Sequence, residues 1–83
     1  MIKWRLGEVM ARYRIKGIEL AQVMEISNNA VSNYRKATTM PQINGERFNA
    51  LLNALNRLKP ADEPTIGIAD LMEYYPDHEP ESD

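Results

Sequence analysis

The chain has 83 residues, with ten Lys and Arg against twelve Asp and Glu, a formal net charge of −2 and no cysteine. This length fits one small domain, and the lack of cysteine excludes a disulfide framework or a thiolate metal site, as is usual in a reducing cytosol. Charged residues interrupt the N-terminal segment, so no apolar run there is long enough for a signal peptide or a membrane span. We therefore expect a soluble, cytoplasmic protein.

The net charge conceals a difference between two parts of the chain. Residues 1–59 contain all ten cations and only four acids, which gives +6, whereas residues 60–83 contain eight acids and no Lys or Arg, which gives −8. A basic body with an acidic end is typical of a domain that faces nucleic acid and carries an appended segment.

The N-terminal residues predict an amphipathic helix of about three turns. Its apolar stripe consists of Ile2, Leu6, Val9, Met10 and Tyr13. Its other face carries Lys3, Arg5, Arg12 and Arg14. Trp4 lies off the stripe, and we expect it to form a partly covered lid on a helix bundle. Arg12 is either a phosphate contact or part of a solvated face.

Residues 16–36 predict two short helices joined by a bend. Their apolar side chains recur at helical spacing, so each helix has one stripe, and the two stripes can bury each other. These side chains are Leu20, Ala21 and Met24 on the first helix and Val31 and Tyr34 on the second. Ile26 is expected to fill the bend, and Ser27 is expected to cap the second helix at its N-terminus.

A loop and a longer helix follow. Residues 37–42 contain Pro41 and hydroxyl side chains, which predict a connection. Asn44 is a good N-cap, and Ile43 and Phe48 have the spacing of a hydrophobic staple. The apolar stripe of this helix, which we assign to the core, consists of Phe48, Leu51, Leu52, Leu55 and Leu58.

The C-terminal part combines loops with one short helix. Pro60 ends the preceding helix, and residues 59–67 form a loop. A final helix over residues 68–74 is expected, followed by an acidic, disordered tail over residues 76–83 that is too poor in apolar residues to order itself. The side chains expected to dock this end on the bundle are Ile68, Leu71, Met72 and Tyr75.

The two helices within residues 16–36 have the pattern of a helix-turn-helix, whose second helix lies in a DNA major groove. Small Ala21, Ile26-Ser27 and Val31 at their spacing resemble the lambda-repressor and Cro-like (XRE) regulators, in a compact single-domain subfamily. Residues 2–6, 51–55 and 70–77 extend the resemblance, so it covers about residues 2–77. It implies an all-α fold, a compact bundle of about five short helices, with a helix-turn-helix DNA-binding domain over residues 1–75.

Three positions depart from the family pattern. Glu25 stands in the bend where the family usually has Gly, and a left-handed side chain there costs on the order of 1 kcal/mol. Gly17 stands where the family often has a Gln that contacts phosphate. Arg35-Lys36-Ala37 replaces the usual Glu-x-Gly at the end of the second helix, and Arg35 and Lys36 can replace the lost phosphate contact.

The resemblance also implies which residues contact DNA. The expected base contacts are Asn28, Asn29, Ser32 and Asn33. The expected phosphate contacts are Gly17, Arg35, Lys36, Thr38 and Thr39. An asparagine amide can donate to and accept from adenine together, although one of the three asparagines can instead cap the helix or face solvent.

We therefore predict a sequence-specific double-stranded DNA-binding transcriptional regulator, a repressor, that reads the major groove with helix 28–36. We expect a homodimer, with its seam at the last helix or the edge of residues 48–58, because two half-sites strengthen specific binding. The alternative is a protein-interaction module, such as an antitoxin or anti-regulator, whose acidic end binds a basic protein partner.

Catalysis and cofactor binding have little support in the sequence. The chain has no Cys, its single His lies in the tail, and neither a Gly-rich phosphate loop nor a pair of acids within the apolar framework occurs. Asp77-His78-Glu79 is expected to be solvated, and only remotely a metal site. We therefore expect neither an enzyme nor a cofactor.

Overall fold

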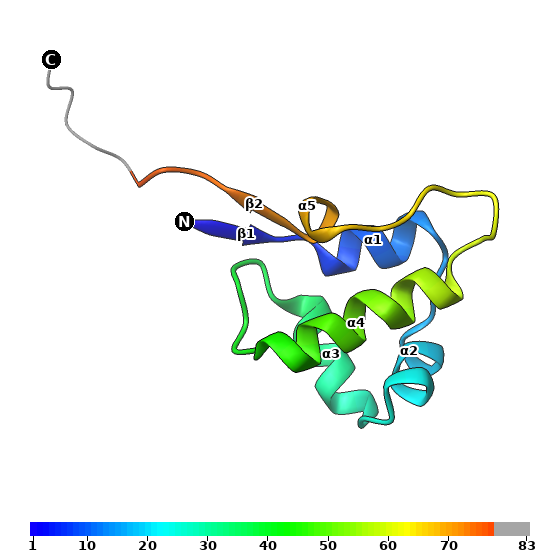
Figure 1. The fold of residues 1–83 in the computed structure, drawn as a ribbon. Coiled ribbons are helices and arrows are strands. Elements are labelled where there is room, and N and C mark those ends of the chain that lie inside the picture. Colours follow the sequence, from blue (N-terminus) through cyan, green and yellow to red (C-terminus); the bar gives the residue numbers. More distant parts are fainter. Residues whose placement is uncertain (78–83) are drawn as a thin grey trace, which may run out of the picture.

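Five helices and a two-stranded ribbon make up residues 1–77, which are the residues that this computed structural model describes (Figure 1). In chain order the elements are β1 (Ile2–Trp4), α1 (Leu6–Arg12), α2 (Gly17–Met24), α3 (Asn28–Lys36), α4 (Gly45–Leu58), α5 (Ile68–Leu71) and β2 (Met72–Tyr74). The helices form one body, and the ribbon extends from one end of it, next to α1 and α5. The predicted tail lies outside the described residues from residue 78 onward.

The two ends of the domain are strands, so the prediction of an all-α fold is wrong at these positions. The N-terminal helix begins at Leu6 instead of Ile2, and the last helix ends at Leu71 instead of continuing to Tyr74. β1 and β2 pair antiparallel, with Ile2 opposite Tyr74 and Trp4 opposite Met72. β-branched and aromatic side chains favour paired strands, and the pairing partners are too far apart in sequence for a local pattern to reveal them.

Hydrogen bonds extend the ribbon beyond its named strands. The Met1 amine donates to the Tyr75 carbonyl oxygen at 2.7 Å, and the Tyr75 amide donates to the Met1 carbonyl oxygen at 2.9 Å. The Arg5 guanidinium donates to the carboxylates of Glu73 and Glu8, which raises the pKa of Arg5. The ribbon therefore joins the start of the domain to its end by both backbone and side-chain contacts.

The core lies between α1, α2, α3 and α4 and extends under the ribbon. Its buried members are Trp4, Leu6, Val9, Met10, Ile15, Leu20, Ala21, Val31, Leu51, Ala54, Leu55, Ile66 and Leu71. The stripe of α4 is confirmed as core: Leu51 and Leu55 are fully buried, and the rest of the stripe packs partly against them. Full burial of each of these two leucines contributes about 1.5–3 kcal/mol.

Three expectations about individual apolar side chains are wrong. Trp4 is not a partly covered lid: only 3% of it is exposed, and its ring lies 5.9 Å from that of Phe48. At the other end of the chain Leu71 docks as expected, but Ile68 and Tyr75 stay exposed. α5 has only four residues, so it presents one buried position to the body and directs Ile68 away from it.

The caps predicted for α3 and α4 are confirmed. The Ser27 hydroxyl accepts from the Ala30 amide at 3.1 Å, and the Asn44 side-chain oxygen accepts from the Arg47 amide at 2.7 Å. Each bond satisfies one of the amides that the first turn of a helix leaves free. Glu25 ends α2 in the left-handed region with φ of 59°, a conformation that favours glycine.

Asn56 ties the loop before α5 to α4. Its amide nitrogen donates to the Ile66 carbonyl at 2.9 Å, and its side-chain oxygen accepts from the Ile66 amide at 2.7 Å. Ile66 itself is buried, so both of its backbone groups depend on this one side chain. The side-chain amide of Asn56 thus pairs with both backbone groups of Ile66, as the backbone of a neighbouring strand would.

Replacing Asn56 with leucine is expected to lower the free energy of unfolding by about 1–3 kcal/mol, because it leaves the Ile66 amide and carbonyl without partners. Denaturant unfolding followed by circular dichroism measures this change. Asn53→Leu, at an exposed position on the same helix, is the control and should change stability by less than about 0.5 kcal/mol. Equal losses in the two variants would contradict the assigned role of Asn56.

Candidate nucleic-acid interface

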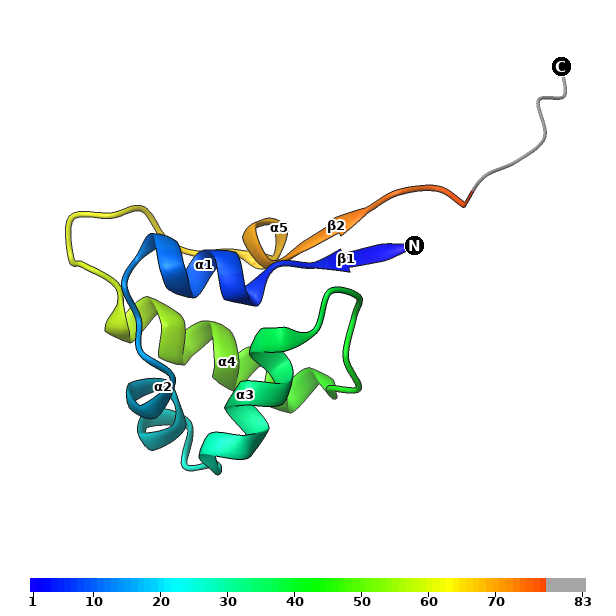
Figure 2. The ribbon, with the colours of Figure 1, turned by 180° about the vertical axis from the view of Figure 1, so that it is seen from behind.

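The outer face of α3 is the candidate interface, and packing of the inner face fixes its orientation. Val31 is buried against the core formed with Leu20 and Ala21 of α2. Tyr34 is half-buried, and its hydroxyl accepts from the Arg47 guanidinium of α4 at 3.3 Å. Figure 2 shows α3 beside α2 and in front of α4. The inner face of α3 is therefore held by both neighbouring helices.

Contacts with β1 and α1 hold the C-terminal end of α3. The Trp4 indole N–H donates to the Tyr34 carbonyl at 2.9 Å, and the Trp4 amide donates to the Thr38 carbonyl, also at 2.9 Å. These bonds satisfy carbonyls at and beyond the last turn, which the helix itself cannot pair. Gly7 permits a close approach of α1, since a Cβ there would lie only 3.0 Å from the Arg35 carbonyl oxygen.

The asparagines of α3 lie on its outer face. Asn28, Asn29 and Asn33 are exposed, whereas Ser32 is half-buried. Ser27 provides the cap of α3, so neither Asn28 nor Asn29 is needed for it. Asn29 and Asn33 are four residues apart and therefore lie next to each other along one helix face.

Two hollows beside α3 bring several predicted contacts together. The smaller one, of about 250 Å³, is lined by Gly17, Ile18, Asn28, Val31, Ser32 and Arg35. The larger one, of about 530 Å³, is lined by Gly7, Met10, Ala11, Arg14, Ile15, Lys16, Gly17 and Arg35. Arg35 borders both, and its Nη1 atom would lie 3.2 Å from a Cβ on Gly17. Thus Gly17 leaves room for the Arg35 guanidinium at the start of α2.

Arg14 and Lys16 belong to this surface, although we did not predict them as contacts. Both are exposed and line the larger hollow together with Arg35. Arg14 has φ of 57°, and this left-handed residue lies in the turn that leads from α1 to α2. Charge counting shows that the first 59 residues are basic. The turn after α1, which determines where Arg14 and Lys16 lie, has no clear signal in the sequence.

The loop after α3 separates the remaining predicted contacts from this hollow. Lys36, Thr38 and Thr39 are exposed, and Thr39 forms a bridge with Lys3 of β1. The last turn of α3 and the loop after it lie toward the ribbon, away from the N-terminal end of α3 (Figure 2). On a third side, Asn33 lines a hollow of about 270 Å³ with Ala30, Tyr34, Pro41 and Gln42. The exposed Gln42 is thus a second amide beside Asn33 that the sequence did not single out.

The cations of this surface have no acidic partners within residues 1–77. Every ion pair found there involves Arg5 or the Met1 amine. Within the described residues, no salt bridge therefore compensates the positive charges of Arg14, Lys16, Arg35 and Lys36. Both ribbon views place α5 and the loop before it on the opposite side of the body from α2 and α3, whereas in the ribbon Glu73 of the acidic part pairs with Arg5 of the basic part.

Residues 1–77 contain no group of three or more potential metal-ligating side chains. The weak Asp77-His78-Glu79 metal hypothesis falls largely outside this described part. None of the described helices combines the length and the apolar character that crossing a membrane requires.

Comparisons of the chain with family models, with curated proteins and with solved structures gave no match. Its function is therefore inferred from its residues and their arrangement.

Proposed function

We propose that this protein binds double-stranded DNA sequence-specifically, as a transcriptional repressor, and that its helical body has the lambda-repressor-like arrangement. The observation that carries the proposal is the outer face of α3. It presents three exposed asparagines beside four cations that have no ion-pair partner among residues 1–77, while its inner face is fixed by packing. Such a rigid helix with amide side chains outward suits the major groove, which admits one α-helix.

Base recognition is assigned to the asparagines. Each amide can donate from its NH2 group to N7 of adenine and accept through its oxygen from the N6 amino group, and a good bidentate pair discriminates by about 1–3 kcal/mol. Asn29 and Asn33 can read neighbouring bases because they lie one turn apart on the same face. Asn28 and Ser32 are assigned to bases or the sugar edge closer to α2, because they line a hollow together with Gly17 and Ile18.

Phosphate contacts are assigned to the cations around this face. Arg14, Lys16 and Arg35 surround the hollow at the start of α2, and Lys36 with the loop hydroxyls of Thr38 and Thr39 lies at the far end of α3. Contacts to phosphate fix the orientation of a protein on the duplex but carry no sequence information directly. The two groups would hold α3 in the groove from both of its ends.

Selection of bound molecules from a pool of random duplexes tests this function. The expected result is one enriched motif that contains adenines, arranged as two half-sites about one helical turn apart. Binding without any enriched motif would contradict sequence-specific recognition. Failure to bind any duplex at low salt would favour the alternative, a module that engages a basic protein partner with its acidic side.

A further inference from the structure

A hollow between α3 and the loop after it opens beside the asparagine face. It has a volume of about 270 Å³, and we call it the loop-side hollow; its lining residues are Ala30, Asn33, Tyr34, Pro41 and Gln42. Ala30, Tyr34 and Pro41 are half-buried and give it apolar walls, whereas Asn33 and Gln42 are exposed. The hollow therefore combines an apolar interior with two side-chain amides at its rim.

The α3 wall of this hollow is held by neighbouring elements. The Tyr34 hydroxyl accepts from the Arg47 guanidinium of α4 at 3.3 Å. The Tyr34 carbonyl accepts from the Trp4 indole of β1 at 2.9 Å. Both the backbone and the side chain of Tyr34 are thus tied to partners outside α3. A wall that is already in place costs little ordering when a ligand binds against it.

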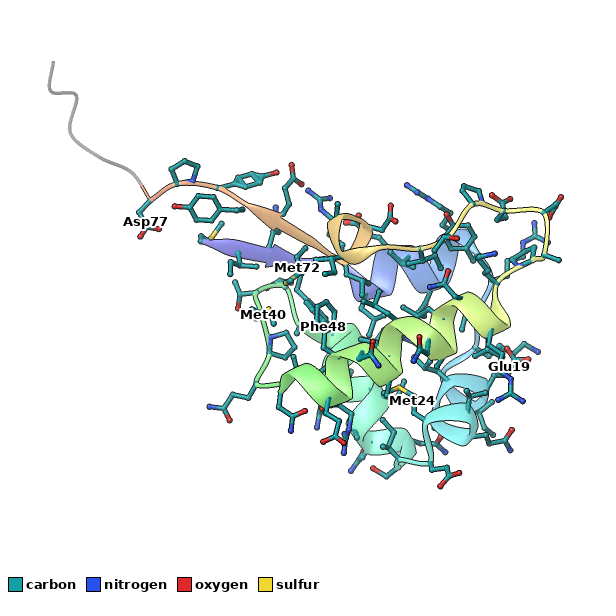
Figure 3. The ribbon with its side chains drawn as sticks, in the orientation of Figure 1. Glu19, Met24, Met40, Phe48, Met72 and Asp77 are labelled. Carbon is teal, nitrogen blue, oxygen red and sulfur yellow. The ribbon has the colours of Figure 1, made fainter. Side chains whose placement is uncertain are left out.

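The loop wall is anchored on both sides of Pro41. Before it, Thr39 forms a bridge with Lys3 of β1, and after it, the Asn44 side chain caps α4. Figure 3 shows Met40, the residue that precedes Pro41, below the ribbon in the stretch between these anchors. The ring of Pro41 fixes its own φ. The segment that carries Pro41 and Gln42 is therefore short and held at both ends.

The chemistry of the major groove indicates what such a hollow can receive. The C5-methyl group of thymine is the one apolar group that the base pairs present there. The other groups are hydrogen-bond donors and acceptors, which an apolar wall would leave unpaired. On thymine the O4 acceptor lies next to the carbon that carries the methyl group. A site for this base therefore needs an apolar hollow with a hydrogen-bond donor at its rim.

We propose that the loop-side hollow is a thymine-reading subsite, which receives the C5-methyl group while the Gln42 amide donates to O4 of the same base. Gln42 is then a specificity-determining residue that lies outside the helix-turn-helix. This inference rests on the proposed function, because it names a base that the same surface reads. It also predicts part of the bound sequence: Asn33 lines the hollow, so the adenine assigned to Asn33 lies next to this thymine.

The two parts of the subsite are needed together to select thymine. Cytosine has the N4 amino donor in place of O4 and no methyl group. A glutamine amide has both donors and an acceptor, so Gln42 alone could turn and accept from cytosine. The apolar walls supply the discrimination that the amide lacks, because only thymine fills them.

Deoxyuridine in the selected duplex tests the subsite without changing the protein. Uracil keeps O4 and lacks only the methyl group. We expect one thymine position in each half-site, next to the adenine read by α3, at which the substitution weakens binding about fourfold, the factor for burying one methyl group. The remaining thymines are the controls. Specific binding with no such position would overturn the subsite and leave the proposed function standing, whereas a lack of specific binding to any duplex would overturn both.

Gln42→Glu connects the sensitive position to the loop. A carboxylate accepts from cytosine N4 and has no donor for O4. The ratio of affinities for thymine and cytosine at this position should therefore shift toward cytosine by at least ~10-fold. Gln22→Glu, which adds the same charge at an exposed position of α2, is the matched control and should keep the preference for thymine. An unshifted ratio in Gln42→Glu would overturn the role of Gln42.

Ala30→Leu connects the methyl group to the hollow, because the larger side chain fills it from α3. The variant should bind the thymine and uracil duplexes with affinities in a ratio of about one, instead of the ratio of about four expected for one buried methyl group. A ratio that stays near four in folded Ala30→Leu, with folding checked by circular dichroism, would overturn the methyl assignment. If this variant fails to fold, the deoxyuridine scan and Gln42→Glu decide.

Discussion

Replacing Trp4 with alanine is expected to lower the free energy of unfolding by about 3–5 kcal/mol, the usual cost of truncating a buried aromatic residue. Only 3% of Trp4 is exposed, and its ring packs against that of Phe48. The backbone amide of Trp4 also donates to the Thr38 carbonyl. Domains of this size are stable by only about 5–15 kcal/mol. The variant should therefore be at the limit of folding.

Denaturant unfolding of Trp4→Ala and Trp4→Phe separates the two roles of this residue. Phenylalanine fills most of the site but cannot donate to the Tyr34 carbonyl, so Trp4→Phe should lose less stability than Trp4→Ala. Because Trp4→Phe loses this hydrogen bond to α3, it should also show faster amide hydrogen exchange in the last turn of that helix. A loss below about 1 kcal/mol for Trp4→Ala would contradict the assignment of Trp4 to the core.

Removing Arg35 and Lys36 together is expected to weaken binding to every duplex by a similar factor and to reduce its salt dependence. Each phosphate contact contributes about −0.9 to the slope of log K against log salt, so the double alanine variant should have a slope smaller in magnitude by about 1.8. The physical reason is release of fewer condensed counterions. Sequence preference should remain, since contacts to phosphate position the protein and do not read bases.

Fluorescence anisotropy with labelled duplexes over a range of salt concentrations measures both quantities. Arg57→Ala, which removes an exposed cation from α4, is the matched control and should leave the slope unchanged. If Arg57→Ala and the double variant reduced the slope equally per charge, binding would reflect overall charge instead of contacts around α3.

Local signals predicted the parts of the fold that depend on neighbouring residues. Ser27 and Asn44 cap their helices as expected, because a cap is an interaction between residues three apart. The stripe of α4 likewise gave its core side chains. The ribbon was missed because Ile2 is paired with Tyr74, and nothing near either residue distinguishes such a strand from an extra helical turn. Trp4 was misplaced for the same reason.

The candidate interface was predictable to a similar degree. Helical spacing alone places Asn29 and Asn33 outward once Val31 is buried. The positions of Arg14 and Lys16 depend on the turn after α1, and that of Gln42 depends on how the loop after α3 folds back beside Asn33. These positions depend on tertiary structure. Residue type therefore suggests which side chains could contact DNA, but it does not predict that they lie on one surface.

The most direct test of the central claim, that α3 reads DNA bases, compares two pairs of asparagines. Asn29→Ala/Asn33→Ala changes α3, and Asn49→Ala/Asn53→Ala changes two exposed asparagines with the same spacing on α4. Affinity is measured for the duplex enriched from the random pool and for a scrambled duplex. We predict that the α3 variant loses most of its preference, about 10-fold or more for 1–3 kcal/mol per contact, while the α4 variant keeps it. Unchanged preference in the α3 variant would contradict the claim.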